Sequence, residues 1–265
     1  MNPHVKVHIL HCGKVIVDRR LAYKDPEWTH VPQLEERTEE NHLTLPVSCY
    51  LIEHPEGDLV IDAGWSDEVR MEPERHLGFA SRFCRAEPPP GQSVTEQLAL
   101  RNRTPEQIRY VLISHLDVDH ISGSPLLKGA GTFLVSGPEL RGAREHQIKR
   151  CGDIRLTPFE LEPIPYGPYG LGKDVYGDGT VYLVHTPGHT AGLTSVLARV
   201  EGGWLLLVSD AAYSESSWSE PILPGNTSSD EEALSSLEWI REFSRRDDCL
   251  AIIANHDPSV QERTY

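Results

Sequence analysis

The chain has 265 residues, of which 38% are hydrophobic and 25% charged, a balance that supports a sizeable core and excludes a disordered or low-complexity chain. Its 25 basic and 40 acidic residues give a net charge of −15, which argues against a surface built to bind nucleic acid or an anionic membrane. The 20 prolines and 21 glycines are dispersed rather than gathered in a linker, so we expect one domain over residues 1–265.

The five cysteines are widely spaced and form no CxxC pair, so neither a disulfide framework nor a sulfur-ligated zinc site is indicated. Near the N-terminus, the apolar stretch 5–17 is interrupted by His8, His11 and Lys14, which predicts neither a signal peptide nor a membrane span. We therefore expect a cytoplasmic protein with reduced thiols.

The first part of the chain predicts mostly β-structure. Residues 5–17 alternate in polarity like a strand and its hairpin partner, with Gly13 at the turn. Residues 47–53 and 59–62 predict a second hairpin. Residues 67–91 show no clear period and end in three prolines, so we expect a long loop there with at most one helical turn. Such a loop is a candidate wall of a binding pocket.

The rest of the chain mixes α and β elements. The best-defined helix is 229–245, where Leu234, Leu237, Ile240 and Phe243 recur at helical spacing. The mixture favours two packed sheets with helices outside. The other predicted elements are helices over 94–100 and 136–149 and strands over 110–114, 132–136, 181–185, 204–208 and 250–254.

Potential metal ligands follow five of the predicted strands. They are Asp62, the cluster from His115 to His120, His189, Asp210 and His256. In the cluster, His115 and Asp117 are two apart and can point to one side of an extended turn, whereas Asp119 and His120 can reach a second centre. So many carboxylates and imidazoles demand a compensating cation. Two metals side by side are therefore predicted, and ligands without thiolate favour zinc, iron, manganese or cobalt.

Five short motifs, in this order, resemble those of the metallo-β-lactamase superfamily. They are LVIDAG (59–64), SHLDVDH (114–120), TPGHTAG (186–192), VSDAAY (208–213) and ANHD (254–257). Within the superfamily, LPVSCYLIE (45–53) and the tyrosine three residues after Asp210 resemble the N-acyl homoserine lactone lactonases. The resemblance implies an α/β fold, the αββα sandwich of two mixed β-sheets with helices outside.

The resemblance also implies a role for each residue of the motifs. The implied ligands of the first metal are His115, Asp117 and His189, those of the second are Asp119, His120 and His256, and Asp210 bridges the two. Asp62 would support a ligand from behind. Tyr213 would reach the carbonyl or ring oxygen of the substrate, and Asp119 would also shuttle a proton.

Asp117 departs from the family pattern, which has a second histidine at this position. The change raises the ligand charge from two carboxylates to three, against a formal +4 for two divalent ions. A harder, less positive site shifts the preference from zinc toward iron or manganese and makes a bridging water a weaker acid. Two divalent ions are expected, zinc first and iron or manganese as alternatives. Two further alternatives are an empty first site and an Asp117 side chain that points away.

The resulting functional hypothesis is hydrolysis of a small-molecule lactone or ester by a hydroxide that bridges the metals. The alternatives are a dinuclear iron protein for redox or oxygen chemistry, a thioester hydrolase of the glyoxalase II type, and a metal-binding module without catalysis. Aromatic residues of the segments 67–91 and 165–176 are candidates to line the substrate pocket, or else to pack within loops or form a homodimer contact. They are Phe79, Phe83, Tyr166, Tyr169 and Tyr176.

Overall fold

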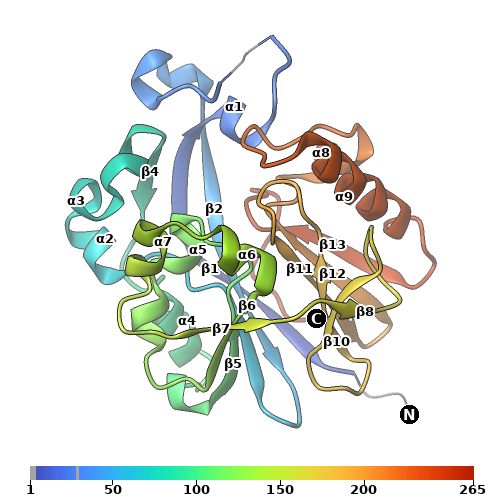
Figure 1. The fold of residues 1–265 in the computed structure, drawn as a ribbon. Coiled ribbons are helices and arrows are strands. Elements are labelled where there is room, and N and C mark those ends of the chain that lie inside the picture. Colours follow the sequence, from blue (N-terminus) through green and yellow to red (C-terminus); the bar gives the residue numbers. More distant parts are fainter. Residues whose placement is uncertain (1–3, 28–29) are drawn as a thin grey trace.

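The computed structural model describes residues 4–27 and 30–265 as two β-sheets packed face to face with helices on their outer sides (Figure 1). This is the αββα sandwich expected from the sequence. The first sheet has the order β4-β1-β2-β3-β5-β6-β7. Its strands are β1 (Lys6–Asp18), β2 (His42–Glu53), β3 (Asp58–Ile61), β4 (Cys84–Glu87), β5 (Ile108–Leu112), β6 (Thr132–Ser136) and β7 (Leu156–Phe159).

The second sheet has the order β13-β12-β11-β10-β9-β8. Its strands are β8 (Glu162–Pro163), β9 (Leu171–Asp174), β10 (Val181–His185), β11 (Thr194–Val200), β12 (Gly203–Ser209) and β13 (Cys249–Ala254). The helices are α1 (Arg19–Ala22), α2 (Asp67–Met71), α3 (Pro73–Leu77), α4 (Val94–Ala99), α5 (Val118–Ile121), α6 (Gly137–Gly142), α7 (Glu145–Arg150), α8 (Glu215–Ser219) and α9 (Asp230–Phe243), with short 3-10 turns at Leu34–Glu36, Glu39–Asn41, Gly78–Arg82, Pro105–Gln107 and Ser124–Leu127.

The main core lies between the two sheets. Inward side chains of the first sheet, such as Ile9 and Leu112, pack against those of the second, such as Leu183 and Leu205, and all four are fully buried. On the outer side of the second sheet, α9 presents its buried stripe, which includes Leu237 and Ile240. Burial on both faces explains why the central strands are continuously apolar.

Strand direction gathers the predicted ligands at one edge of the sandwich. In the first sheet β3 and β5 run parallel, so the segments that follow them, with Asp62 and His115, leave on the same side. In the second sheet β12 and β13 are parallel, and β10 has the same direction because both β10 and β12 are antiparallel to β11. The segments that carry His189, Asp210 and His256 therefore also leave together.

Several sequence predictions are confirmed. The helices α4 and α9 and the strands β5, β6, β10, β12 and β13 lie where they were expected, within two residues at most of their ends. The hairpin of β2 and β3 also forms, although β2 begins at His42, five residues before the predicted start. Helix α9 begins after Ser229, whose hydroxyl accepts the backbone N–H of Glu232 as the cap-and-acid pattern predicted.

The predicted hairpin over 5–17 is wrong. Residues Lys6–Asp18 form one long strand, and the pairing of β1 with β2 shifts between His11 and Lys14. Gly13, with φ of 97°, provides the irregular residue at this bulge rather than a chain reversal. A glycine within an alternating pattern marks either feature, so the sequence did not distinguish them.

The loop predicted over 67–91 is also wrong, because it contains α2, α3, a 3-10 turn and β4. Each of these elements has only four or five residues, too few for a period to be visible. The single helix predicted over 136–149 is two helices, since Ala143 is extended and separates α6 from α7. Strand β11, which completes the second sheet, was not predicted.

Within the described ranges, no helix combines the length and the apolar character needed to cross a membrane. The five cysteines are free thiols. Burial raises the pKa of four of them, to about 12 for Cys84, to about 11 for Cys151, well above the usual value for Cys49, and above it for Cys249. At neutral pH these four side chains are therefore protonated and poor nucleophiles.

Candidate metal centre

The structure brings together the seven side chains that the resemblance implied as ligands. The first group is His115, Asp117 and His189, whose ligand atoms lie within 4.8 Å of one another. Asp117 Oδ2 is 3.1 Å from His189 Nε2 and 3.7 Å from His115 Nε2. Asp117 thus points into the group rather than away from it, as its two-residue spacing from His115 predicted.

The second group is Asp119, His120 and His256, again within 4.8 Å. Asp119 Oδ2 lies 3.4 Å from His256 Nε2 and 3.9 Å from His120 Nε2. Residues 118–121 form the one-turn helix α5, which turns Asp119 and His120 away from the direction of His115 and Asp117. One short segment therefore supplies ligands to both groups.

Asp210 lies between the two groups. Its Oδ1 is 3.2 Å from His120 Nε2, and its Oδ2 is 3.3 Å from His256 Nε2. The same Oδ2 is 4.0 Å from the Nε2 atoms of both His115 and His189. A carboxylate in this position can bridge two cations.

Unsatisfied polar atoms show that the donor set fits metal ions. His115 Nε2, His120 Nε2 and Asp210 Oδ1 are buried and have no hydrogen-bond partner among the described residues. Buried polar atoms are rarely left unpaired, because the loss of hydration is costly. Imidazole nitrogens and carboxylate oxygens that converge without partners are ligands for divalent ions, so the residues fit a dinuclear site.

The electrostatics agree with this assignment. Burial by itself would lower the pKa of His120, but the carboxylates of Asp210, Asp62 and Asp119 raise it well above the usual value. In the same way, burial opposes but Asp117 raises the pKa of His189, to about 9. The negative field thus attracts protons when no metal competes, and metal binding displaces them.

A second set of contacts orients the imidazoles. His120 Nδ1 donates to Asp62 Oδ2 at 2.7 Å, so Asp62 supports a ligand from behind as the resemblance implied. His189 Nδ1 donates to the carbonyl of Asn226 at 2.8 Å, and His256 Nδ1 donates to that of Pro46 at 2.7 Å. With the proton held on Nδ1, each Nε2 presents its lone pair to the centre.

Glu139 is a functional candidate that the sequence did not reveal. Its Oε1 accepts the N–H of Leu116 at 2.9 Å, and its Oε2 accepts the Thr190 hydroxyl at 2.7 Å and the N–H of Gly192 at 3.1 Å. This buried carboxylate therefore connects the segment of His115 and Asp117 to the segment of His189. In the sequence, Glu139 looked like an ordinary acidic residue in the first turn of a helix whose N-cap is Ser136.

Tyr213 reaches the centre, as predicted. Its hydroxyl donates to Asp210 Oδ2 at 3.0 Å, and its side chain is almost fully buried. The ring stacks on that of His256, with centroids 5.4 Å apart. Burial and then the charges of Asp210, Asp119 and Asp117 raise the pKa of Tyr213 well above its usual range, so the hydroxyl keeps its proton at neutral pH.

A cavity of about 1260 Å³ opens from the metal centre, with Asp117, Asp119, Asp210 and Tyr213 in its wall. The predicted aromatic residues divide between this cavity and other places. Phe79 and Phe83 line it, whereas Tyr166, Tyr169 and Tyr176 do not.

For the segment 165–176 the packing alternative holds and pocket lining does not, because this segment packs on the second sheet and on the β2–β3 turn. Tyr166 contacts Tyr182 and Trp204, and Tyr176 stacks on His54 with centroids 3.5 Å apart.

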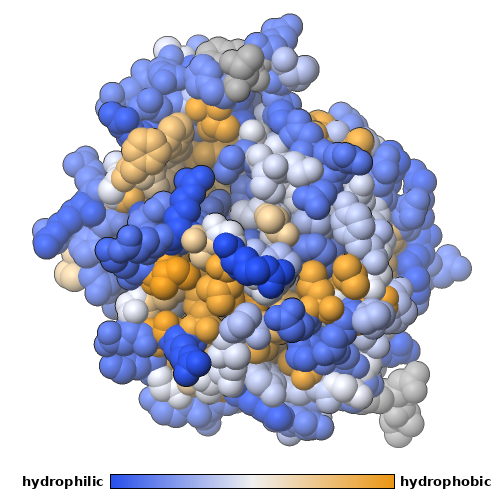
Figure 2. Space-filling model, viewed as in Figure 1, coloured by the Kyte–Doolittle hydropathy of each residue, from blue (hydrophilic) through white to orange (hydrophobic). Residues whose placement is uncertain are grey.

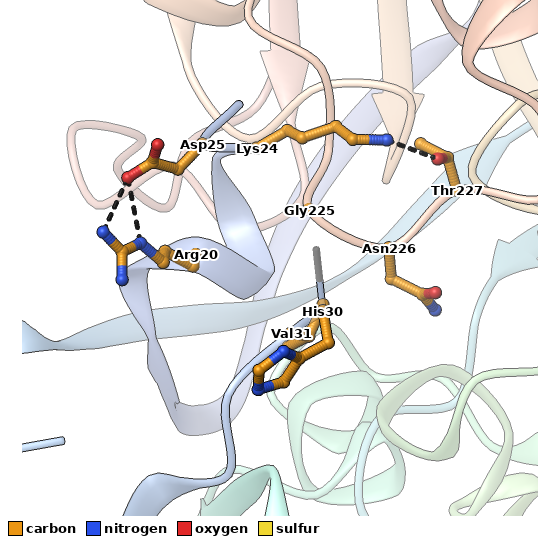
Figure 3. A pocket seen from close by; sticks show the side chains of 8 residues that line it. All are labelled: Arg20, Lys24, Asp25, His30, Val31, Gly225, Asn226 and Thr227. Atoms are coloured by element: carbon orange, nitrogen blue, oxygen red, sulfur yellow. Dashed lines mark hydrogen bonds and ion pairs between the residues drawn. The ribbon is translucent and has the colours of Figure 1, made fainter. Parts of the chain in front are cut away.

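A smaller cavity of about 240 Å³ adjoins the larger one and shares Val31 and Asn226 with it (Figure 3). The side chains of Arg20 and Lys24 line this small cavity, and each forms an ion pair, Arg20 with Asp25 at 2.7 Å and Lys24 with Asp230 at 2.5 Å. The backbone of Asn226 separates this small cavity from His189.

Comparison with known proteins agrees with this geometry. The family model described as the Metallo-beta-lactamase superfamily matches residues 43–247. The N-acyl homoserine lactonase AttM of Rhizobium radiobacter is 31% identical over 221 residues, which cover 82% of this chain and 83% of that protein. An N-acyl homoserine lactonase of Bacillus cereus is 30% identical over 206 residues, 76% of this chain and 78% of the relative.

Solved structures share the fold. One is an N-acyl homoserine lactone hydrolase with the product N-hexanoyl-L-homoserine bound at its catalytic metal centre, which has a TM-score of 0.77, 23% identity and coverage of 96% of this chain and 93% of that one. Another is AidC, a dizinc quorum-quenching lactonase, with a TM-score of 0.65, 16% identity and coverage of 98% and 90%.

Proposed function

This chain belongs to the metallo-beta-lactamase superfamily, and from that premise we propose that it is a metal-dependent hydrolase that opens the ring of N-acyl homoserine lactones or related lactones. The observation that carries the proposal is the convergence of seven ligand side chains with the Tyr213 hydroxyl at the base of one cavity. The relatives named as N-acyl homoserine lactonases support the choice of a lactone over a thioester.

Two divalent ions would be held by the two groups, with Asp210 between them. When bound, they would lower the pKa of a coordinated water and polarise the lactone carbonyl. We propose zinc first, as in the dizinc neighbour. The third carboxylate, Asp117, favours iron or manganese more than a histidine would at this position.

Two side chains act on the substrate in this proposal. Tyr213 keeps its proton at neutral pH because its pKa is raised, so its hydroxyl would donate a hydrogen bond to an oxyanion that forms at the carbonyl carbon. To do so the hydroxyl exchanges its bond to Asp210 for one to the substrate. Asp119 lines the cavity with a side chain that is 14% exposed, and it would carry a proton to the departing ring oxygen.

The test uses metal-loaded protein and lactones that differ in acyl length. We expect Tyr213→Phe to lower kcat/KM by about a hundredfold, in the range typical of a lost oxyanion donor. Asp119→Asn should be lower still, because it removes both a ligand and a proton carrier. Tyr169→Phe is the matched control, since its ring is 44% exposed and lies outside the cavity.

Three results would contradict the proposal. They are wild-type turnover by both variants, faster hydrolysis of thioesters than of any lactone, and the absence of lactone hydrolysis by protein that holds two equivalents of metal.

A further inference from the structure

Basic side chains gather at the outer wall of the metal-centre cavity. They come from α3 and from the segment of α7, namely Arg75, His76, Arg144, His146, Lys149 and Arg150. Outside the metal centre, Glu68 is the one acidic residue among the described residues that line this cavity. We call these six residues the basic rim. Figure 2 shows the hollow in the upper left of this face, with apolar side chains in its wall and strongly hydrophilic ones beside it.

This local charge contrasts with the −15 of the whole chain. Three members of the rim have acidic neighbours. Arg75 bonds Glu72 at 2.8 Å, His76 Nε2 lies 3.7 Å from the same carboxylate, and Lys149 bonds Glu145 at 2.7 Å. These pairs lie at the surface, where ion pairs contribute little energy and are easily exchanged.

Arg150 has a different environment. Its guanidinium donates to the carbonyls of His76 at 2.6 Å and Leu77 at 2.8 Å, which connects α7 to α3. Among the described residues, no carboxylate lies within 4.0 Å of Arg150 or of Arg144. Partial burial lowers the pKa of Arg150, yet a guanidinium remains charged at neutral pH. A half-buried cation bound only to neutral carbonyls retains N–H groups and charge for an anion.

The rim is held close to the metal centre. Gln147 Nε2 donates to the carbonyl of Leu116, between two ligands, at 3.0 Å. Arg150 follows Gln147 by three residues, about 4.5 Å along the helix axis. Cys84 lines the same cavity as Asp117, Asp119 and Arg150.

Phe79 and Phe83 supply an apolar stretch of the same cavity, with ring centroids 5.5 Å apart. The cavity thus combines the metal centre, which would take a carbonyl, with an apolar wall and a positive rim. We propose that the basic rim, through Arg150 and Arg144, selects lactones whose substituent is an apolar chain that ends in an anionic group, such as a carboxylate. This inference rests on the proposed lactonase function and names its preferred substrate class.

The test compares two acyl homoserine lactones with the same six-carbon chain, one ending in a methyl group and the other in a carboxylate. We expect the protein to prefer the carboxylate substrate, by a lower KM. Arg150→Gln should reduce the preference about tenfold, as for a lost charge-assisted hydrogen bond, with most of the change in KM. Added salt should also reduce the preference, because it screens the rim.

Arg144→Gln is the second variant, since its exposed side chain connects no helices and its loss leaves the fold intact. It should reduce the preference in the same direction, by a smaller factor. Arg245→Gln, an exposed position at the end of α9 and outside the cavity, removes the same charge and should leave the preference unchanged.

The outcomes separate the two proposals. If both lactones are hydrolysed and the ratio of their kcat/KM values is the same in the wild type, Arg144→Gln and Arg150→Gln, the rim does not select the substrate and this inference is wrong. If neither lactone is hydrolysed by metal-loaded protein, the proposed lactonase function fails and the inference fails with it.

Discussion

Asp117 is the residue at which this chain departs from its family, and its geometry makes the departure chemically meaningful. Its side chain is 38% exposed, yet Oδ2 approaches both imidazoles of the first group. Burial acts against ionisation, but the hydrogen bonds with His115 and His189 hold its pKa well below the usual value. The residue is therefore an anionic oxygen donor where a neutral nitrogen is usual.

Removal of this carboxylate should empty one site and leave the other. We expect Asp117→Ala to bind one equivalent of divalent metal instead of two, because only His115, His189 and the shared Asp210 remain for the first ion. Asp117→His should retain two equivalents and shift the preference toward zinc over manganese, since imidazole is the softer ligand. Elemental analysis of protein from media with mixed metals measures both effects.

The control is Asp153→Ala, whose carboxylate is 94% exposed and is not among the residues that line the cavity. Unchanged metal content in Asp117→Ala would show that Asp117 is not a ligand.

His185 ends strand β10 and titrates outside the metal centre. Burial lowers its pKa from 6.5 to about 4, and its Nδ1 has no hydrogen-bond partner among the described residues. Because the folded pKa lies below the unfolded one, the unfolded chain binds more protons between pH 6.5 and 4. Its contribution to stability is thus present above pH 6.5 and is lost as the pH falls to about 4.

A side chain that cannot titrate should remove this loss. Between pH 7 and 4 we expect His185→Phe to gain on the order of 3 kcal/mol in the free energy of unfolding relative to the wild type. Denaturant unfolding at both pH values measures the difference. His146→Phe, at an exposed position, should show the wild-type pH dependence, and an equal acid loss in His185→Phe would refute the assignment.

At the scale of elements, helix α6 positions two ligand segments through Glu139. The carboxylate accepts three hydrogen bonds from residues on both sides of the first metal group. Close packing adds to this, because a Cβ on Gly192 would lie 2.1 Å from the backbone nitrogen of Glu139. The relative position of the two segments that carry the first metal group therefore depends on their contacts with Glu139.

Glu139→Gln keeps the size of the side chain but replaces one carboxylate oxygen by an NH₂ group. In one orientation this NH₂ group faces the N–H of Leu116, and in the other it faces the donors of Thr190 and Gly192, so in both it meets another donor. We expect metal affinity of the first site to fall by about 10- to 100-fold, the usual cost of a lost outer contact. The second site should keep its affinity. A two-step metal titration of the apo-protein measures each site, with the exposed Glu242→Gln as control.

Equal losses at both sites would instead indicate general destabilisation, and two unchanged affinities would show that Glu139 does not position the ligands.

How far the sequence predicted these elements depended on the range of the interactions involved. The convergence of the seven candidate ligands was predictable because their segments follow apolar strands, and strand direction then brings them together. Glu139 and Arg150 were not, since their partners are 23 to 74 residues away and leave no local pattern. For the aromatic residues of 165–176 the sequence left two alternatives open for the same reason, because a pocket-lining ring and a packed one look alike in sequence.

For the whole molecule, the metal centre is a junction between the two sheets. Ligands that follow β5 come from the first sheet, and His189, Asp210 and His256 follow strands of the second. The three carboxylates of the candidate ligand set also carry part of the acidic excess. Two divalent ions would change the formal net charge from −15 to about −11 and remove the repulsion within the centre.

Metal removal should therefore loosen the contact between the two halves. We expect a chelator to lower Tm by about 10 °C or more, because two ions at a hundredfold excess over Kd each contribute about 2.7 kcal/mol. Added zinc or manganese should restore Tm. The chelator should lower the Tm of Asp117→Ala by less than that of the wild type, since this variant has one ion to release. The loss should shrink as pH falls, because His120 and His189 take up protons in place of metal, which weakens metal binding and with it the stability that the metal contributes. Thermal unfolding with and without chelator measures this change in Tm. An unchanged Tm after complete removal of metal would show that the contact between the two sheets does not depend on it.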